Sequence, residues 1–81
     1  MSLEHILLGI LHRPASGYQI KNDFDLVFSH FWSAELSQIY RTLKSLEKRG
    51  LLTSKTERSE KGPDRRIYRR TADGRSALLE L

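Results

Sequence analysis

The 81-residue sequence contains no cysteine, so neither a disulfide nor a thiolate metal site can stabilise it. Cysteine-free chains suit reducing compartments, and we therefore expect a cytoplasmic protein. Long apolar runs are also absent: the apolar-rich stretch 3–11 contains Glu4 and His5 and is far shorter than the roughly 20 residues needed to cross a bilayer. The start of the chain also lacks the basic segment and small-residue cleavage site of a secretory signal. The sequence thus predicts no membrane association.

Residues suited to catalysis or metal binding are present, but they do not form a motif. There is no glycine-rich phosphate loop, and the three histidines are not spaced as metal ligands. Asp23 and Asp25 lie two positions apart on a predicted helix and point to different faces, which argues against a catalytic pair. No serine or histidine lies in a motif that would activate a nucleophile. We therefore expect no enzymatic activity, no metal and no cofactor.

The length predicts one domain, residues 1–81, and the charge divides it into two unlike halves. A chain this short buries only about 60–65% of its unfolded surface, so modest stability is expected. The formal net charge is +4, but residues 1–40 are acidic overall and twelve of the fourteen lysines and arginines lie in 41–81. The second half is the part expected to meet a polyanion such as DNA, with a merely basic solvated surface as the alternative.

Apolar residues at helical spacing predict two helices in the first 30 residues. Ser2 is a suitable N-cap for the first helix, and Pro14 stops it. Ser16 to Gln19 has the form of a capping box that starts the second helix, with Tyr18 packed near its beginning. The predicted inward faces are Leu3, Ile6, Leu7, Ile10 and Leu11 in the first helix, and Ile20, Phe24, Val27, Phe28 and Phe31 in the second.

A third helix is predicted to begin after Ser33, its expected N-cap, with Glu35 in the first turn, where the helix dipole favours a negative charge. Gly50 ends this helix. The aromatic segment 30–32 before it is expected to close part of the core. The inward residues of the third helix are predicted to be Leu36, Ile39, Tyr40, Leu43 and Leu46.

Two short strands and a last helix follow. Leu51–Arg58 and Arg65–Thr71 have strand character and enclose a turn, 59–64, that contains Gly62 and Pro63. Thr71 is expected to cap a helix over residues 72–81. This order predicts a mainly α (α+β) fold, a winged helix-turn-helix with a three-helix core, a two-stranded β wing and a C-terminal helix. In such folds the third helix enters the DNA major groove and the wing touches the flanking backbone.

Seven short motifs occur in order and cover nearly the whole chain. They are Leu7-Leu8-Gly9-Ile10-Leu11, Ser16-Gly17-Tyr18-Gln19-Ile20, His30-Phe31-Trp32-Ser33, Ser37-Gln38-Ile39-Tyr40, Leu43-x-x-Leu46-Glu47-x-x-Gly50-Leu51, Gly62-Pro63-Asp64-Arg65 and Tyr68-x-x-Thr71-x-x-Gly74. Together they resemble the N-terminal domain of the PadR family of transcriptional regulators. The resemblance implies a homodimeric repressor of a two-fold symmetric operator, whose DNA affinity falls when a small aromatic or drug-like compound binds.

The sequence departs from this family pattern at two places. Arg41 stands where the family usually has proline, which adds a cation to the outer face of the third helix. The family's C-terminal helical dimerisation region is absent or reduced to the segment after Thr71. We therefore expect either a shortened form of a regulator or a minimal member that dimerises through its first helix and its last, from about residue 72.

The candidate base-reading residues lie on the outer face of the third helix. Glutamine can pair bidentately with adenine, and arginine or lysine with guanine, each pair discriminating by about 1–3 kcal/mol. A solvated polar face is the alternative. Tyr40 fits the inward stripe, and the resemblance adds a phosphate contact through its hydroxyl. The predicted DNA contacts on this helix are Ser37, Gln38, Tyr40, Arg41, Thr42 and Lys44.

Candidate phosphate contacts lie at helix starts and on the wing. Ser16, Tyr18 and Ser33 are placed at helix N-termini, where exposed amides bind phosphates, although plain capping is the alternative for the two serines. The wing cations flank Gly62-Pro63 and can reach the minor groove or its phosphates, with a charged loop as the alternative. These wing residues are Lys61, Arg65 and Arg66.

The sequence as a whole favours a DNA-binding repressor over one other function. A winged-helix domain can lose DNA binding and use the same surfaces on protein partners, which makes a protein-interaction module the alternative. Basic residues on both the third helix and the wing favour DNA. Trp32 is predicted to be a core residue rather than part of an aromatic ligand pocket at a dimer interface.

Overall fold

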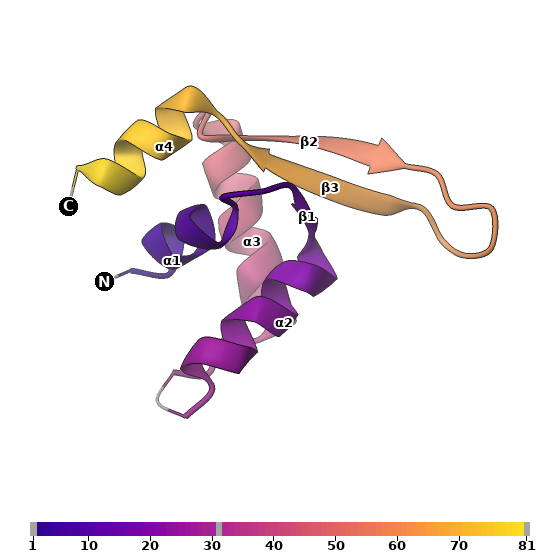
Figure 1. Cartoon of the computed structure of the whole chain (residues 1–81), viewed down its shortest axis with the longest axis horizontal. Helices are drawn as coiled ribbons and strands as arrows, with labels where there is room; N and C mark the ends of the chain where they lie inside the picture. Colours follow the sequence, from indigo (N-terminus) through magenta and orange to yellow (C-terminus); the bar gives the residue numbers. More distant parts are fainter. Residues whose placement is uncertain (1, 31, 81) are drawn as a thin grey trace.

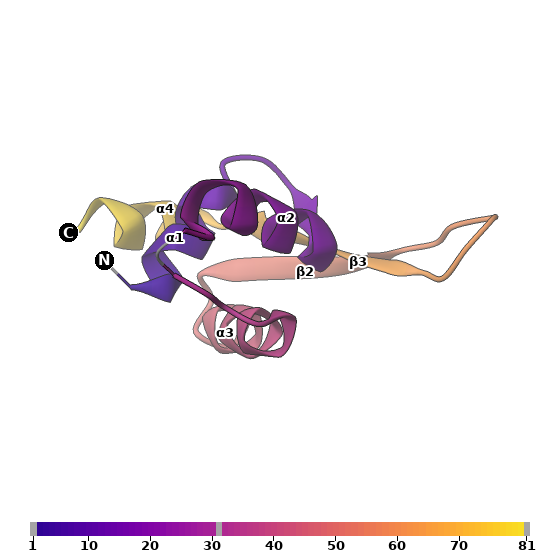
Figure 2. The same ribbon diagram turned by 90° about the horizontal axis from the view of Figure 1, so that it is seen from below.

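The computed structural model describes residues 2–30 and 32–80 of the chain. Within them the elements run α1 (Leu3–Ile10), β1 (Ala15–Ser16), α2 (Gly17–Phe28), α3 (Leu36–Lys48), β2 (Leu52–Glu57), β3 (Arg65–Arg70) and α4 (Ala72–Leu79). Figure 1 shows the helices gathered at one end and the β2–β3 hairpin extending away from them as a wing. Turned by 90°, α2 and α3 lie on opposite sides of this ribbon (Figure 2). The predicted winged helix-turn-helix architecture is confirmed.

Local sequence signals place most of the helix ends. The hydroxyl of Ser2 accepts a hydrogen bond from the His5 backbone N–H at 3.3 Å. At α2 the capping box is complete, because Ser16 Oγ accepts from the Gln19 N–H at 3.2 Å and Gln19 Oε1 accepts from the Ser16 N–H at 2.8 Å. Each cap satisfies helix-end amides that have no partner within the helix.

The last two helix boundaries also follow the sequence. Thr71 Oγ1 accepts from the Gly74 N–H at 3.0 Å and caps α4. Gly50 ends α3 with a positive φ of 79°, a left-handed conformation that glycine adopts without a steric penalty. The caps predicted at Ser2, Ser16 and Thr71 and the glycine stop at Gly50 are therefore confirmed.

The predicted cap at Ser33 is wrong. α3 begins at Leu36, and its N-cap is Glu35, which makes no side-chain cap hydrogen bond and is not in the first turn. The segment before α3 is held in another way: Ala34 is only 1% exposed, and its carbonyl accepts from Lys21 Nζ at 2.8 Å. Burial of Ala34 and this tertiary hydrogen bond override a serine cap worth about 1 kcal/mol, and Ser33 remains exposed outside the helix.

The sheet has three strands rather than the predicted two. β1 pairs antiparallel with β3, with Ala15 opposite Tyr68 and Ser16 opposite Ile67, so the strand order is β1-β3-β2. Two residues are too few for a periodic pattern, which is why the sequence does not reveal β1. The wing register runs from Leu52 opposite Arg70 to Glu57 opposite Arg65. β2, β3 and α4 each end one or two residues before the predicted limits.

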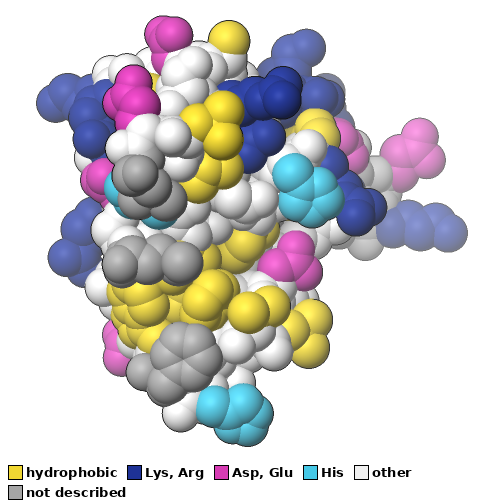
Figure 3. Space-filling model, turned by 60° about the vertical axis from the view of Figure 1, so that its left-hand side comes forward, with side chains coloured by type: hydrophobic (Ala, Val, Ile, Leu, Met, Phe, Trp, Pro, Cys, Tyr) yellow, Lys and Arg dark blue, Asp and Glu magenta, His cyan; other side chains and the backbone are white. Residues whose placement is uncertain are grey.

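Two apolar predictions in α2 are wrong. Val27 is 62% exposed and Tyr18 is 67% exposed, and the neighbouring Leu26 is 81% exposed. The buried stripe of α2 is narrow because Ile20, Phe24 and the half-buried Phe28 recur every four residues and fill it. Figure 3 shows apolar side chains gathered on the face near the two chain ends. Phe31 was also predicted to face inward and lies outside the described residues.

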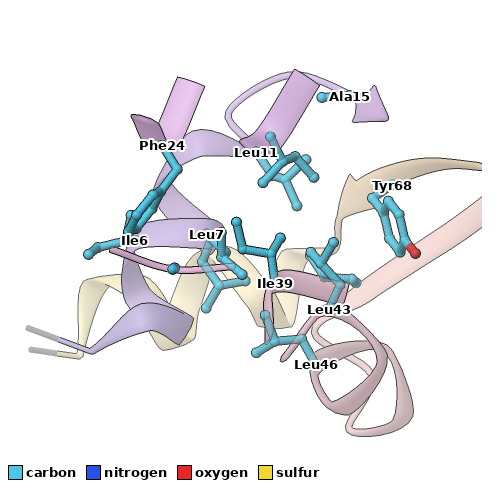
Figure 4. Close-up of a cluster of buried hydrophobic side chains, with 13 residues drawn as sticks. Ile6, Leu7, Leu11, Ala15, Phe24, Ile39, Leu43, Leu46 and Tyr68 are labelled. Carbon is cyan, nitrogen blue, oxygen red and sulfur yellow. The ribbon is translucent and has the colours of Figure 1, made fainter. Parts of the chain in front are cut away.

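The core lies between α3, α1, α2 and the base of the sheet. Figure 4 shows side chains from all of these elements converging on one cluster. Trp32 packs against the cluster with its ring edge-on to Phe24, the ring centroids being 5.9 Å apart, which fits the predicted core role. The buried apolar residues are Ile6, Leu7, Leu8, Leu11, Ala15, Ile20, Phe24, Ala34, Ile39, Leu43, Leu46, Leu52 and Tyr68.

Candidate nucleic-acid interface

Helix α3 has one buried face and one exposed, cationic face. Ile39, Leu43 and Leu46 are 0% exposed and anchor the helix in the core. The opposite face presents Arg41, Lys44 and Lys48, spaced so that all three lie on one side of the helix. The core therefore fixes the helix while leaving its cations in solvent, an arrangement suited to reading a polyanion.

The predicted reading residues on α3 differ in how free they are. Ser37, Gln38, Arg41 and Lys44 are exposed, and no side chain of this group has a hydrogen bond or ion pair with the rest of the described chain. Thr42 is half-buried, and its hydroxyl donates to the Gln38 carbonyl at 2.9 Å within the same helix. Four of these side chains are thus available to a partner, whereas the Thr42 hydroxyl is already engaged.

Tyr40 connects α3 to the start of α2. Its ring lies directly over Gly17, where an added Cβ atom would come within 2.5 Å of Tyr40 Cζ and Oη. Gly17 therefore leaves the space that the ring occupies. Tyr40 remains 37% exposed, so it only partly fills the inward position predicted for it. The contact places its hydroxyl beside the first turn of α2, next to the exposed Tyr18.

The two serines predicted to contact phosphate at helix N-termini, Ser16 and Ser33, do not present free hydroxyls at a helix start. Ser16 is 6% exposed, and both its hydroxyl and its backbone N–H are used in the capping box of α2. Ser33 is exposed but lies before Glu35, outside α3. The structure therefore gives Ser16 the capping role that was its alternative, and it removes the helix N-terminus on which the Ser33 prediction rested.

The three predicted wing cations have different surroundings. Lys61 is exposed in the loop at the wing tip, with no ion pair to any described residue. Arg65 Nη2 lies 3.1 Å from Glu57 Oε1 in an exposed pair across the hairpin. Arg66 Nη1 donates to Ser54 Oγ at 2.7 Å. An exposed pair of the Arg65 kind contributes little and exchanges readily, so it leaves Arg65 available to a phosphate.

A cleft separates the wing from the start of α2, and we call it the wing cleft. Tyr18 and Tyr40 lie on one side of it, and Arg65 and Arg66 on the other. Several further polar residues that were not among the candidates also line it, including Asn22 of α2, Arg58 just after β2, and the acidic Glu57 and Asp64. Arg58 has a weak signal in the sequence, a cation at the end of a strand in the basic half of the chain.

Comparison with known proteins places this arrangement in a family. The model of the transcriptional regulator PadR-like family matches residues 6–80. The chain belongs to the PadR-like family. The fold expected from the sequence resemblance is thereby confirmed at the level of the family.

Two curated relatives resemble nearly the whole of this PadR-like chain. The probable transcriptional regulator Rv1176c of Mycobacterium tuberculosis is 34% identical over 79 residues, which are 96% of this chain and 42% of the relative. The negative transcriptional regulator PadR of Bacillus subtilis is 35% identical over 77 residues, which are 94% of this chain and 42% of the relative. The chain thus spans less than half the length of these relatives.

A solved structure agrees with these relatives. The crystal structure of Bacillus subtilis PadR in complex with operator DNA superposes with a TM-score of 0.87 at 34% identity, covering 96% of this chain and 45% of that chain. The similarity therefore extends over α3, the wing and the wing cleft together.

Inside the PadR-like fold, one buried phenol, that of Tyr68, is influenced by polar residues of α3 and the wing. Burial is the main reason that the pKa of Tyr68 lies above its ordinary value of 10.0. The guanidinium of Arg66 acts in the opposite direction, while Tyr40 and Glu47 raise the pKa further. Burial therefore favours the neutral form of Tyr68, and polar groups of both α3 and β3 act on its phenol through electrostatics.

Metal-ligand clusters and membrane-spanning helices are both absent from the part of the chain that the structure describes. Across 2–30 and 32–80 no three histidine, aspartate or glutamate side chains come together as a metal site. None of the described helices is long and apolar enough to span a bilayer.

Proposed function

We propose that this chain is a single DNA-binding domain of a transcriptional regulator and that α3 reads bases in the major groove. The observation that carries the proposal is the exposed face of α3, where Arg41, Lys44 and Lys48 lie on one side of the helix and make no ion pair within the described chain. The similarity to a PadR solved with operator DNA, which extends over these same elements, supports it. A protein-interaction module is less well supported, because both α3 and the wing are basic.

The proposal divides the surface into base readers and phosphate contacts. Gln38, Arg41 and Lys44 are exposed along α3 and carry the polar groups that recognise adenine or guanine edges. Ser37 in the first turn of α3, and the wing cations Lys61 and Arg65, are proposed to contact phosphates. Neutralised phosphates release counterions, so binding should weaken steeply as salt increases.

We further propose a homodimer that acts as a cytoplasmic repressor on a two-fold symmetric operator. Leu26, Val27 and Leu79 are 81%, 62% and 74% exposed, and apolar surface of this kind often marks a protein interface. Leu79 belongs to α4, which packs on α1, so the first and last helices can contribute to the dimer. Two copies of α3 would then lie about one DNA turn apart.

The small aromatic effector expected from the family resemblance remains a proposal. A groove between α1 and α2 has an apolar lining that suits such a compound, with Ile6, Ile10 and Phe28 on its walls and Leu78 of α4 at its edge. Titration of small aromatic acids into a preformed DNA complex tests this proposal. Release of the DNA at concentrations that leave the fold intact would support it, and unchanged binding across all compounds would contradict it.

Charge-matched variants test the DNA-binding proposal. Arg41→Ala combined with Lys44→Ala removes two cations from the reading face, whereas Arg13→Ala combined with Arg75→Ala removes two exposed cations outside α3 and the wing. Fluorescence anisotropy with labelled duplex DNA should show at least a roughly 10-fold weaker Kd for the first variant. The second should stay within about 3-fold of the unmodified chain, because screened distant charges contribute little. Equal losses would mean that only net charge matters.

A further inference from the structure

A chain of two hydrogen bonds joins α3 to both strands of the wing. Ser54 Oγ on β2 donates to Glu47 Oε2 on α3 at 2.7 Å. Arg66 Nη1 on β3 donates to the same Ser54 Oγ, also at 2.7 Å. One serine hydroxyl thus connects the helix proposed to read DNA with the strand that carries a wing cation.

The chemistry of the serine fixes which groups donate and which accept in these two hydrogen bonds. A hydroxyl has a single hydrogen, and in Ser54 the carboxylate of Glu47 takes it. The oxygen lone pairs are then left for the guanidinium of Arg66. The carboxylate therefore sets the direction of the serine hydroxyl, and the hydroxyl in turn fixes one end of the arginine side chain.

The sheet register brings the partners together on one face. Ser54 is opposite Tyr68 and Thr56 is opposite Arg66, so Ser54 and Arg66 are diagonal neighbours on the face that Tyr68 shares. Tyr68 is buried against the core beneath α3, so this face of the hairpin is turned toward that helix. The electrostatic effects of Glu47 and Arg66 on the Tyr68 phenol agree with this placement.

Arg66 is held where it lines the wing cleft. The hydrogen bond to Ser54 uses one of its five N–H donors, and the others remain for a ligand. A free arginine loses much of its rotamer freedom when it grips a phosphate, and fixing it beforehand removes part of that loss. We propose that Glu47 and Ser54 are positioning residues that hold Arg66 in the wing cleft for a phosphate of the DNA backbone. This inference rests on the proposed function.

A double-mutant cycle between Ser54 and Arg66 tests the inference on DNA. Ser54→Ala removes the link and leaves both charges, and Thr53→Ala is the matched control on the other face of the same strand. With a duplex of about 30 bp, roughly three helical turns, Ser54→Ala should weaken the Kd about 3- to 10-fold, and Thr53→Ala less than 2-fold. Arg66→Ala should bind no more weakly when Ser54→Ala is added to it.

Each outcome of the cycle has one meaning. Effects of Ser54→Ala and Arg66→Ala that multiply would overturn the inference, because the serine would then act without the arginine. Ser54→Ala binding like Thr53→Ala would overturn it as well, while DNA binding by the unmodified chain would leave the proposed function intact. Failure of the unmodified chain to bind the duplex at low salt would instead overturn the proposed function, and this inference with it.

Side-chain dynamics test the role of Glu47 without DNA and separate positioning from folding. Nitrogen-15 relaxation of the Arg66 Nε in the free chain reports how firmly the guanidinium is held. Glu47→Ala and Ser54→Ala should both increase its motion, whereas Thr53→Ala should not. Thermal unfolding of the same variants establishes that each is folded. Unchanged motion of Arg66 in folded Glu47→Ala and Ser54→Ala would overturn the proposed positioning.

Discussion

Replacing Gly17 with alanine is expected to weaken DNA binding while leaving most of the fold's stability in place. The ring of Tyr40 lies over Gly17, and an added Cβ would lie 2.5 Å from Tyr40 Cζ and Oη, so the ring must turn away. Because the obstacle is the end of a side chain that is already 37% exposed, it can turn into solvent without moving the backbone. The Tyr40 hydroxyl would then leave the start of α2.

Two opposing effects set the stability of Gly17→Ala. Alanine loses less backbone entropy than glycine on entering a helix, which favours the variant by about 0.5–1 kcal/mol. Turning the ring into solvent re-exposes apolar surface, and roughly 60 Å² at about 25 cal/mol per Å² costs about 1.5 kcal/mol. The net destabilisation should therefore be about 0.5–1 kcal/mol, which lowers the Tm of a domain of this size by about 2–8 °C.

DNA affinity should change more than stability. A hydrogen bond from the Tyr40 hydroxyl to a phosphate is charge-assisted, and its loss is expected to weaken the Kd about 10- to 100-fold. Anisotropy titrations and thermal unfolding of Gly17→Ala, Tyr40→Phe and Gly9→Ala measure both effects. Gly9 has open space around an added Cβ, so Gly9→Ala should be more stable by about 0.5–1 kcal/mol and should bind DNA with unchanged affinity. If Gly17→Ala and Tyr40→Phe both bind DNA with the Kd of the unmodified chain, this reasoning is refuted.

Three further predictions concern the reading face, the start of α4 and the buried phenol. Arg41→Ala should weaken binding by about 1–3 kcal/mol and relax the preference at one base pair of each half-site, and an unaltered preference would show that Arg41 does not read bases. In Gly74→Ala the added Cβ would collide with the Leu51 carbonyl oxygen, so the free energy of unfolding measured in urea should fall by about 1–3 kcal/mol. An unchanged free energy of unfolding would contradict this steric argument. The raised pKa of Tyr68 provides stability that is present below pH 10 and is lost as pH rises through the higher folded-state value. Stability should therefore fall less steeply above pH 10 in Tyr68→Phe, and equal slopes would contradict this.

The features predicted correctly from the sequence are those that neighbouring residues determine. The caps at Ser2 and Thr71 and the left-handed glycine at Gly50 depend on residues within one helical turn. The features predicted wrongly depend on distant partners. Ser33 lost its cap because Lys21, on another helix, holds the Ala34 carbonyl, and β1 exists only through its pairing with β3.

The candidate site divides in the same way. The cationic face of α3 follows from helical spacing alone, and the sequence therefore identified Arg41 and Lys44 as exposed. Which cations are engaged depends on contacts between elements, and nothing in the local pattern shows that Arg66 bonds to Ser54. The space that Gly17 leaves for Tyr40 likewise appears only when α2 and α3 are packed together.

Selection from random-sequence duplex DNA across a salt series tests the central claim most directly. The purified chain is incubated with the pool, and the retained DNA is sequenced at each salt concentration. If the protein is a dimeric DNA-binding regulator, the retained DNA should be enriched in an inverted repeat with half-sites about one helical turn apart. The amount of DNA retained should also fall steeply as the salt concentration rises. No retention at low salt, or retention without an enriched sequence, would contradict the account and favour a protein-interaction module.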